Sequence, residues 1–435
     1  MKLEEENKPI DELNQNKNIK LYSNNENYKL YHGSMLDMLN AIEPNSIDSI
    51  ITDPPYELNF MNKGWDNSGI AFQSDTWKKC YEVLKSGGYL LAFGGSRTFH
   101  RIACAIEDAG FEIRDTIMWL YGSGFPKSLN IGLAIDKKNG IESKVIGKSK
   151  SGSTSKAFNL NEQQRKAGTG ILAGEYDLKE AQNEWNGWGT ALKPSFEPII
   201  VARKPFKGPL VDNVIKYGVG GINIDECRVA TTDTWHRKEQ ETNTAIEYQR
   251  KNKLMYAQKS EGQMNKNGRF PANTILTYDE TDFGEVCGGF PITGKESSSR
   301  YFYCAKASKK DRDEGLDEFE DKKFYSTLNT KNGSGERLDG GTTPIRKNTH
   351  PTVKPTELMQ YLVRLVTPNN GTILDPFNGS GSTGKAVMYE NKERNKNYKY
   401  IGIELTEEYL PISKARIEYV CNLPEKKEIT IFDYI

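Results

Sequence analysis

Apolar and polar positions follow two regular patterns in the first part of the chain. Continuous apolar runs at 47–52, 89–93 and 111–120 are typical of strands buried in a sheet. Residues 74–86 and 99–109 instead repeat apolar side chains at the spacing of one helical face. Strands that alternate with helices of these lengths predict right-handed crossovers in a mostly parallel sheet.

The same alternation returns near the C-terminus. Residues 355–366 are typical of an amphipathic helix, and strands are predicted at 372–374 and 398–403. A last helix is predicted at 407–420, with acidic residues in its first turn. The predicted fold class is therefore α/β, with a doubly wound, mostly parallel sheet of the Rossmann-like type.

The chain between these two parts lacks comparable periodicity. We therefore predict one domain formed by residues 28–122 and 349–435, with a large irregular insertion at 123–348. Within this insertion, residues 195–204 favour one further strand of the sheet. Residues 1–27 are polar and predict a disordered tail.

Composition excludes several classes of protein. The chain has 59 basic and 59 acidic residues, so its net charge of +0 gives no overall indication of nucleic acid. No apolar run approaches the roughly 18 residues of a membrane span. The first residues lack the apolar core of a signal peptide, which predicts a cytoplasmic protein. Six scattered cysteines and four histidines predict reduced thiols and no metal site.

A polar tetrapeptide follows the predicted strand at 47–52. It consists of Asp53, Pro54, Pro55 and Tyr56. A carboxylate, two prolines and an aromatic ring at the carboxyl end of a strand suit a rigid lip that holds a flat polar ring, because ligands of open α/β sheets bind at that end. The same four residues also suit a strand stop followed by a turn.

A second group of residues combines a strand, a Gly-rich loop, a helix and a later acid. The loop contains Asp375, Phe377, Gly379 and Gly381, and Glu404 ends the next predicted strand. An acid in that position can accept hydrogen bonds from ribose hydroxyls. The loop matches neither the dinucleotide pattern nor a phosphate-binding P-loop, which indicates a ligand with a ribose and no polyphosphate. S-adenosylmethionine fits this description.

Together the two groups resemble the amino-methyltransferases of DNA. Residues 53–56 (Asp-Pro-Pro-Tyr) and 375–381 (Asp-Pro-Phe-Asn-Gly-Ser-Gly) stand in the permuted order of the β class, with the catalytic block first. Residues 350–355 (His-Pro-Thr-Val-Lys-Pro) look like the segment that precedes the cofactor strand in that class. The resemblance covers roughly residues 28–120 and 349–420 and extends to phage and bacterial modification methylases.

The resemblance implies methyl transfer from S-adenosylmethionine to the exocyclic N6 of an adenine flipped out of duplex DNA. In this mechanism the Asp53 carboxylate and the Pro54 carbonyl accept hydrogen bonds from the two N–H groups of the amine. Pro54 and Pro55 restrict the backbone, and Tyr56 stacks on the base. We also expect the insertion to act as the target-recognition region of a restriction-modification methylase.

Cofactor contacts follow from the same resemblance. Phe377, Gly379 and Gly381 are expected to line S-adenosylmethionine, Asp375 to lie beside it, and Glu404 to hold its ribose.

Two further residues carry a less direct expectation. Lys354 is expected to meet the methionine carboxylate, or else to be a solvated residue before the helix. Ser34 stands where many members have an aspartate near the adenine, and its hydroxyl can still form a hydrogen bond.

Several alternatives stay open at the level of sequence. The chain resembles N4-cytosine methyltransferases as well, although those more often carry Ser where this chain has Asp53. A non-catalytic DNA-binding protein, or a methyltransferase of RNA or protein, would also keep parts of the pattern. Basic and aromatic residues alternate at 300–312, which suits double-stranded DNA or a solvated loop surface. The sequence does not decide whether the protein forms a homodimer or has a nuclease partner.

Overall fold

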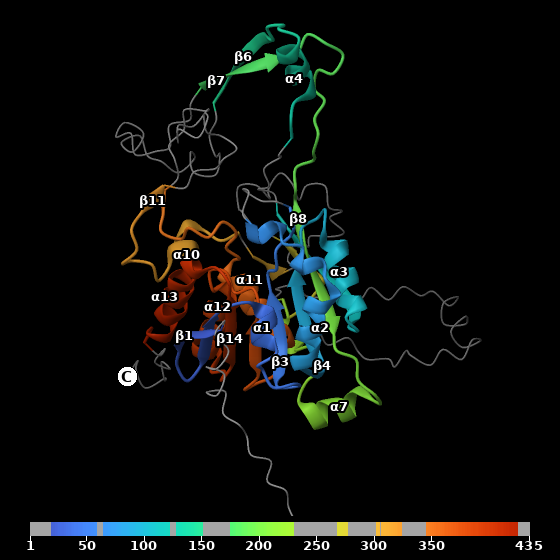
Figure 1. Cartoon of the computed structure of the whole chain (residues 1–435), viewed down its shortest axis with the longest axis vertical. Helices are drawn as coiled ribbons and strands as arrows, with labels where there is room; N and C mark the ends of the chain where they lie inside the picture. The colour runs from blue at the N-terminus through green and yellow to red at the C-terminus, as the bar shows by residue number, and fades with distance from the viewer. Residues whose placement is uncertain are drawn as a thin grey trace, which may run out of the picture.

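A ten-stranded sheet with helices on both faces forms the body of the protein (Figure 1). The computed structural model describes residues 19–58, 64–121, 128–150, 175–229, 268–276, 302–304, 306–323 and 345–424. None of the helices in these ranges is both long and apolar enough to cross a bilayer.

The strand order shows a mostly parallel sheet. From one edge to the other the strands are β1 (Lys20–Asn24), β2 (Tyr28–His32), β14 (Lys399–Glu404), β13 (Thr372–Asp375), β3 (Ile47–Thr52), β4 (Leu84–Phe93), β8 (Phe196–Arg203), β5 (Glu112–Leu120), β9 (Thr274–Leu276) and β10 (Phe302–Tyr303). Among these ten, β1 and β8 run antiparallel to their neighbours, and every other pairing is parallel. The predicted fold class is confirmed.

Successive residues of the central strands feed two separate cores. Ile50 and Leu90 pack with the first set of helices, α1 (Met35–Leu39), α2 (Ser74–Val83) and α3 (Phe99–Asp108). Ile51 and Leu91 point to the other face and pack with the second set, α11 (Thr356–Val366), α12 (Ser382–Arg394) and α13 (Leu410–Cys421). Because side chains alternate along a strand, continuous apolar runs such as 47–52 are what a sheet covered on both faces requires.

The two halves of the domain meet at the centre of the sheet. Strand β13 pairs in parallel with β3, with Leu374 opposite Ile50. Parallel neighbours end at the same edge, so Asp53 and Asp375 follow adjacent strand ends although 322 positions separate them in the printed numbering. The pairing of β3 with β13 thus brings the two motifs side by side.

The N-terminal boundary differs from the prediction. Residues 20–24 form the edge strand β1, which pairs antiparallel with β2, so a disordered tail through residue 27 was wrong. The five residues Lys-Leu-Tyr-Ser-Asn are polar overall, but Tyr22 packs against the core and gives the strand one inner contact. Polar composition hid this strand because an edge strand buries little of its surface. Residues 1–18 lie outside the described ranges.

The boundary between α2 and β4 also moves. The helical pattern predicted over residues 74–86 ends at Val83, and Gly87 and Gly88 lie inside β4. A Cβ on Gly87 would stand 2.2 Å from Asn213 Nδ2, and one on Gly88 would stand 2.9 Å from Leu84 Cδ1. These glycines therefore permit close packing within the strand rather than a helix stop.

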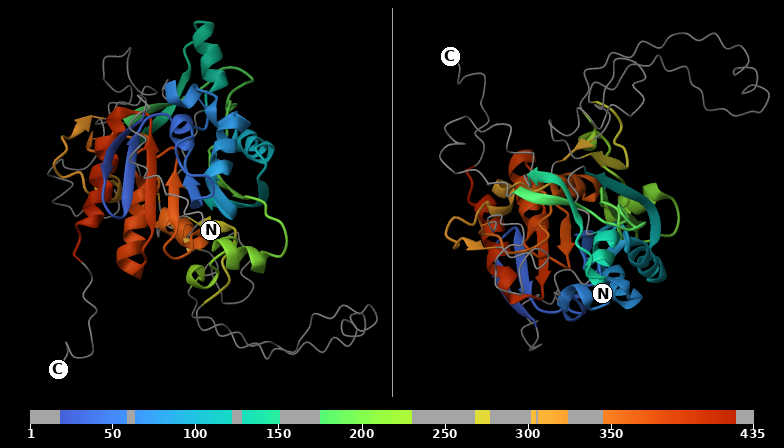
Figure 2. Two further views of the ribbon diagram at one scale, coloured as in Figure 1. Left: turned by 60° about the horizontal axis from the view of Figure 1, so that its bottom comes forward. Right: turned by 90° about the horizontal axis from the view of Figure 1, so that it is seen from above.

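The inserted region contributes to the sheet and also forms an arm. Strand β8 confirms the expected strand at 195–204 and lies between β4 and β5. Strands β9 and β10 extend the same sheet, so the insertion at 123–348 is less separate than predicted. The sequence did not predict these two strands, because strands of two or three residues are too short to show a hydrophobic period. Helix α4 (Ile131–Lys138) and strands β6 (Lys144–Lys150) and β7 (Glu175–Glu180) rise from one end of the body (Figures 1 and 2).

The remaining elements are α7 (Leu210–Tyr217), α10 (Lys309–Asp313), β11 (Lys322–Lys323), β12 (Ile345–Arg346) and the short 3-10 turns Gly64–Asn67, Ile70–Phe72, Asp225–Cys227 and Glu407–Tyr409.

Candidate active site

A cavity of about 380 Å³ lies at the carboxyl ends of β3, β13 and β14. Its walls bring together nearly all the predicted site residues, namely Ser34, Asp53, Pro54, Pro55, Tyr56, Lys354, Asp375, Phe377, Gly379 and Glu404. Gly381 is the predicted site residue that does not line it. Both sequence motifs therefore face one space of a size that is typical for small-molecule sites.

The two oxygens of the Asp53 carboxylate have different surroundings. Oδ2 accepts a hydrogen bond of 2.5 Å from the Lys354 ammonium. Oδ1 is buried and accepts no hydrogen bond from any described residue. Burial raises the pKa of Asp53 above its usual value, and Lys354 opposes this shift by stabilising the charged form. Within the described part of the chain, the site thus contains a buried acceptor atom that lacks a donor.

Lys354 lies between two carboxylates. Its Nζ is 2.5 Å from Asp53 and 3.4 Å from Glu197 Oε2. Burial lowers the pKa of Lys354, but the two carboxylates outweigh burial and raise it, so the side chain stays charged. The alternative of a solvated lysine was wrong, because only 7% of this side chain is exposed. Its expected contact with a methionine carboxylate stays a prediction.

Glu197, which contacts Lys354 and Tyr56, is one functional residue that sequence reasoning missed. It comes from β8 in the inserted region and accepts hydrogen bonds from two tyrosines, Tyr56 at 3.0 Å and Tyr121 at 3.3 Å. The available signal was an acid inside the otherwise apolar run at 196–201, where a buried charge needs partners. Glu197 therefore connects the tetrapeptide to Lys354 and to the insertion.

The backbone after the tetrapeptide is held in place by polar contacts. Thr98 Oγ1 donates to the Tyr56 carbonyl at 2.8 Å. The Asp66 carboxylate accepts the amides of Glu57 and Leu58 at 2.9 and 3.2 Å. Together with the two prolines, these bonds keep the lip of the cavity rigid.

Asp375 ties the end of β3 to the Gly-rich loop. Its carboxylate accepts hydrogen bonds from Thr52 Oγ1 and Thr383 Oγ1, both at 2.6 Å, and from the Phe377 amide at 3.1 Å. Burial raises the pKa of Asp375 to about 6, although these donors oppose the shift. With three donors satisfied, Asp375 shapes the loop as well as lining the cavity.

The two predicted glycines serve different purposes. Gly379 has φ of +52° and lines the cavity, and a Cβ there would stand 2.9 Å from His350 Nε2. Gly381 has φ of +74°, and a Cβ there would stand 2.4 Å from Ser413 Oγ. Gly381 lets the start of α12 approach α13. Its expected contact with the cofactor stays a prediction.

Glu404 closes the far side of the cavity at the end of β14. Its Oε2 accepts a hydrogen bond from the Gly379 amide and its Oε1 accepts one from the Thr406 amide, both at 2.7 Å. Burial raises the pKa of Glu404 to about 7. Ser34 lines the cavity next to this strand end, because the preceding Gly33 amide donates to the Glu404 carbonyl at 3.0 Å.

Comparison with known proteins identifies relatives of the whole arrangement. A model of a DNA methylase family matches residues 47–415. The type II methyltransferase M.HindIII of Haemophilus influenzae is 23% identical over 229 residues, which are 42% of this chain and 61% of that protein. M.HpaI of Haemophilus parainfluenzae is 35% identical over 96 residues, which are 21% of this chain and 31% of that protein. The matched regions thus span less than two thirds of these relatives.

Solved structures give weaker similarity. The PvuII DNA methyltransferase, described as cytosine-N4-specific, aligns over 91% of this chain and 90% of its own, with 13% identity and a TM-score of 0.40. The family match, by contrast, extends over most of the sequence and includes both motifs that line the cavity. The chain therefore belongs to the N6/N4 DNA methylase family.

Proposed function

We propose that this protein transfers a methyl group from S-adenosylmethionine to the exocyclic N6 of an adenine flipped out of duplex DNA. The observation that carries the proposal is the difference between the two Asp53 oxygens: Oδ2 is bonded to Lys354, and Oδ1 is buried with no donor among the described residues. A buried acceptor without a partner is unfavourable, and an amino group that enters the cavity beside Asp53 supplies the missing N–H. Family membership supports the same reaction class.

The chain's residues fit S-adenosylmethionine. When bound, it supplies an electrophilic methyl group on a positively charged sulfur. Each Glu404 oxygen accepts one backbone amide and keeps a lone pair that can accept a ribose hydroxyl. Phe377 offers an apolar wall, and its ring packs on Trp77 with centroids 6.4 Å apart.

The remaining residues activate the target amine. Its lone pair is conjugated into the base, so it is a weak nucleophile until acceptors on its N–H bonds favour a pyramidal nitrogen. Asp53 Oδ1 and the Pro54 carbonyl provide these acceptors where positive charge develops. As the new nitrogen–carbon bond forms, the carbon–sulfur bond of the methyl donor breaks and the neutral thioether leaves. The methylated nitrogen then gives up one proton, which passes by way of Asp53 Oδ1 to solvent. Lys354 holds the carboxylate, and Glu197 offsets the lysine's charge.

Adenine is the proposed base, and cytosine N4 is the alternative outcome. The support is the Asp at the start of the tetrapeptide, in contrast to the Ser that is more frequent in cytosine enzymes. Tyr56 is suited to stack on the base, a contact worth about 1–3 kcal/mol, since its hydroxyl is held by Glu197.

The inserted region is proposed to bind the duplex. Lys306 lies 3.4 Å above the Tyr121 ring, next to the residues that hold Glu197. A basic side chain on an aromatic ring close to the cavity suits contact with a phosphate beside the flipped base.

Long-read sequencing of DNA from cells that express the protein tests the function directly. We expect N6-methyladenine at one short sequence context and none in cells that express an equal amount of the Asp53→Ala variant. Modified cytosine at one context would replace the proposed base. Unmodified DNA in the presence of soluble protein would contradict methyl transfer to DNA.

The affinity for S-adenosylmethionine should depend on pH through Glu404. Its raised pKa of about 7 means that the carboxyl is protonated at lower pH, where it is a poorer acceptor for ribose hydroxyls. We expect affinity to be full above pH 8 and to fall about tenfold per pH unit below pH 7. Calorimetric titration from pH 5.5 to 8.5 measures this slope. The Glu404→Gln variant should bind weakly with no such slope, and a wild-type affinity that is independent of pH would contradict the assignment.

A further inference from the structure

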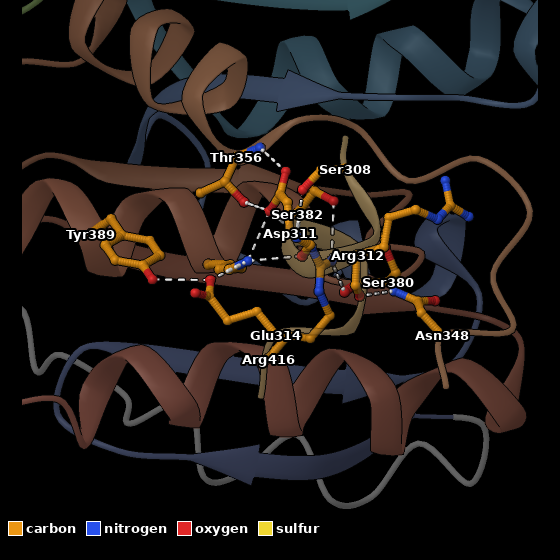
Figure 3. Close-up of polar contacts among 11 residues, drawn as sticks. Ser308, Asp311, Arg312, Glu314, Asn348, Thr356, Ser380, Ser382, Tyr389 and Arg416 are labelled. Atoms are coloured by element: carbon orange, nitrogen blue, oxygen red, sulfur yellow. Dashed lines mark hydrogen bonds and ion pairs between the residues drawn. The ribbon is translucent and has the colours of Figure 1, made fainter. Parts of the chain in front are cut away.

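Residues 306–323, a segment near the end of the inserted region, lie against α11, α12 and α13. Its helix α10 places Asp311 close to α11, α12 and α13 (Figure 3). The Asp311 carboxylate accepts the Thr356 amide at 3.0 Å and the Thr356 hydroxyl at 2.5 Å. It also accepts a hydrogen bond of 2.9 Å from Lys385 Nζ, and the Lys385 side chain is fully buried.

Arg416 joins this segment to the Gly-rich loop. The guanidinium is fully buried, and its Nη2 donates to the Asp311 carbonyl at 3.2 Å. Its Nη1 donates to the Ser380 carbonyl at 2.8 Å and to the Ser382 hydroxyl at 3.2 Å. Because a guanidinium is planar and has donors in fixed directions, it holds these groups in one geometry.

The same segment reaches the other side of the cavity. Thr356 begins α11 two positions after Lys354, whose ammonium contacts Asp53. Arg312 Nη2 donates to the His350 carbonyl at 3.0 Å, and the His350 ring lies against Gly379. Residues of the insertion therefore contact both the cofactor loop and the segment that leads to the catalytic carboxylate.

Asp311 and Arg416 are both charged at neutral pH. Burial raises the pKa of Asp311, but Lys385 and Thr356 outweigh burial and lower it below its usual value. Burial lowers the pKa of Arg416 only to about 10. Apolar side chains could fill this space without the desolvation of charges, but they could not hold the loop's carbonyl and hydroxyls.

We propose that Asp311 is a positioning residue through which the inserted region sets the geometry of the cofactor loop. It acts through Arg416 on Ser380 and Ser382, and through Thr356 on the start of α11. The inference rests on the proposed function, because the loop is taken to bind S-adenosylmethionine.

The Asp311→Asn variant of the full chain tests this role. The variant keeps the carbonyl that accepts from Arg416, and Lys385 keeps Glu314 at 2.7 Å. It loses the charge that pairs with Lys385 at 2.9 Å and with Arg416 at 3.9 Å, so the loop should lose part of its fixed geometry. We expect the Kd for S-adenosylmethionine by calorimetry, and its KM in methyl transfer, to rise at least tenfold. The kcat at saturating cofactor should change less than threefold, and the KM for duplex DNA less than twofold. The matched control is Asp317→Asn, an exposed acid of the same segment, which should leave all values unchanged.

The outcomes separate the inference from the proposed function. A wild-type protein that binds no S-adenosylmethionine would contradict the proposed function. A wild-type protein that binds it, with equal binding by a folded Asp311→Asn variant, would overturn the positioning role alone. A merely structural role predicts a lower melting temperature and similar losses for cofactor and DNA.

A milder variant covers the case in which Asp311→Asn does not fold. Thr356→Val is isosteric and removes one hydrogen bond to Asp311 while it leaves every charge in place. We expect a three- to tenfold rise in the Kd for S-adenosylmethionine at an unchanged KM for DNA. An unchanged Kd in this variant would overturn the proposal.

Discussion

The Asp53→Ala variant should lose methyl transfer to duplex DNA by about 100-fold or more, the range observed when one preorganised group at a developing charge is removed. The substitution deletes the proposed acceptor for the target amine. Binding of S-adenosylmethionine should persist, because the Gly-rich loop and Glu404 keep their contacts. Transfer of a labelled methyl group under single-turnover conditions measures the chemical step.

Two comparisons make this result specific. Lys354 keeps Glu197 as a partner at 3.4 Å in the variant, so the protein should fold and bind DNA. Asp75→Ala removes an exposed acid of α2 and should leave the rate unchanged. A transfer rate in Asp53→Ala within a fewfold of wild type would refute the catalytic role of the carboxylate.

The Lys354→Met variant should be the second most damaging change, and its signature is a shift in pH dependence. Burial raises the pKa of Asp53, and Lys354 is the group that most strongly opposes this shift. Without the ammonium the pKa of Asp53 should rise further. Activity needs the ionised carboxylate, so it is present above this pKa and lost as pH falls through it. The acid limb of the rate profile should therefore move to higher pH, with a marked loss of activity at pH 7.

Single-turnover rates between pH 5.5 and 9.5 check this shift. The matched control is Lys85→Met, which breaks the ion pair between Lys85 and Asp48 at 2.6 Å, away from the cavity. That variant should keep the wild-type pH profile. An acid limb at the wild-type position in Lys354→Met would show that Lys354 does not set the charge of Asp53.

Much of the fold follows from local patterns. The apolar runs at 47–52 and 372–374 predicted buried strands, and the structure shows β3 and β13 as parallel neighbours. Their polar ends meet because parallel strands finish at one edge of a sheet. Errors occurred where the local signal is weak, as in the polar edge strand β1 and the short strands β9 and β10.

The site was predicted less completely than the fold. The tetrapeptide and the Gly-rich loop were found because their residues are contiguous, and a short motif carries its own geometry. Glu197 and Asp311 were not found, because their roles depend on partners far away in the chain. Glu197 is 157 positions from Lys354 by the printed numbering, and no spacing rule connects a strand acid to a lysine before a helix.

The sequence by itself determined where two strands end and which motif follows each of them. It could do so because the hydrophobic period, the prolines and the glycines affect only the backbone within a few residues. Only the tertiary structure decided which charges meet. It placed Lys354 next to Asp53, Glu197 next to Lys354, and Gly381 against Ser413 of α13. The physical reason is that a buried charge is stable only with a partner, and such partners are brought together by packing between distant segments.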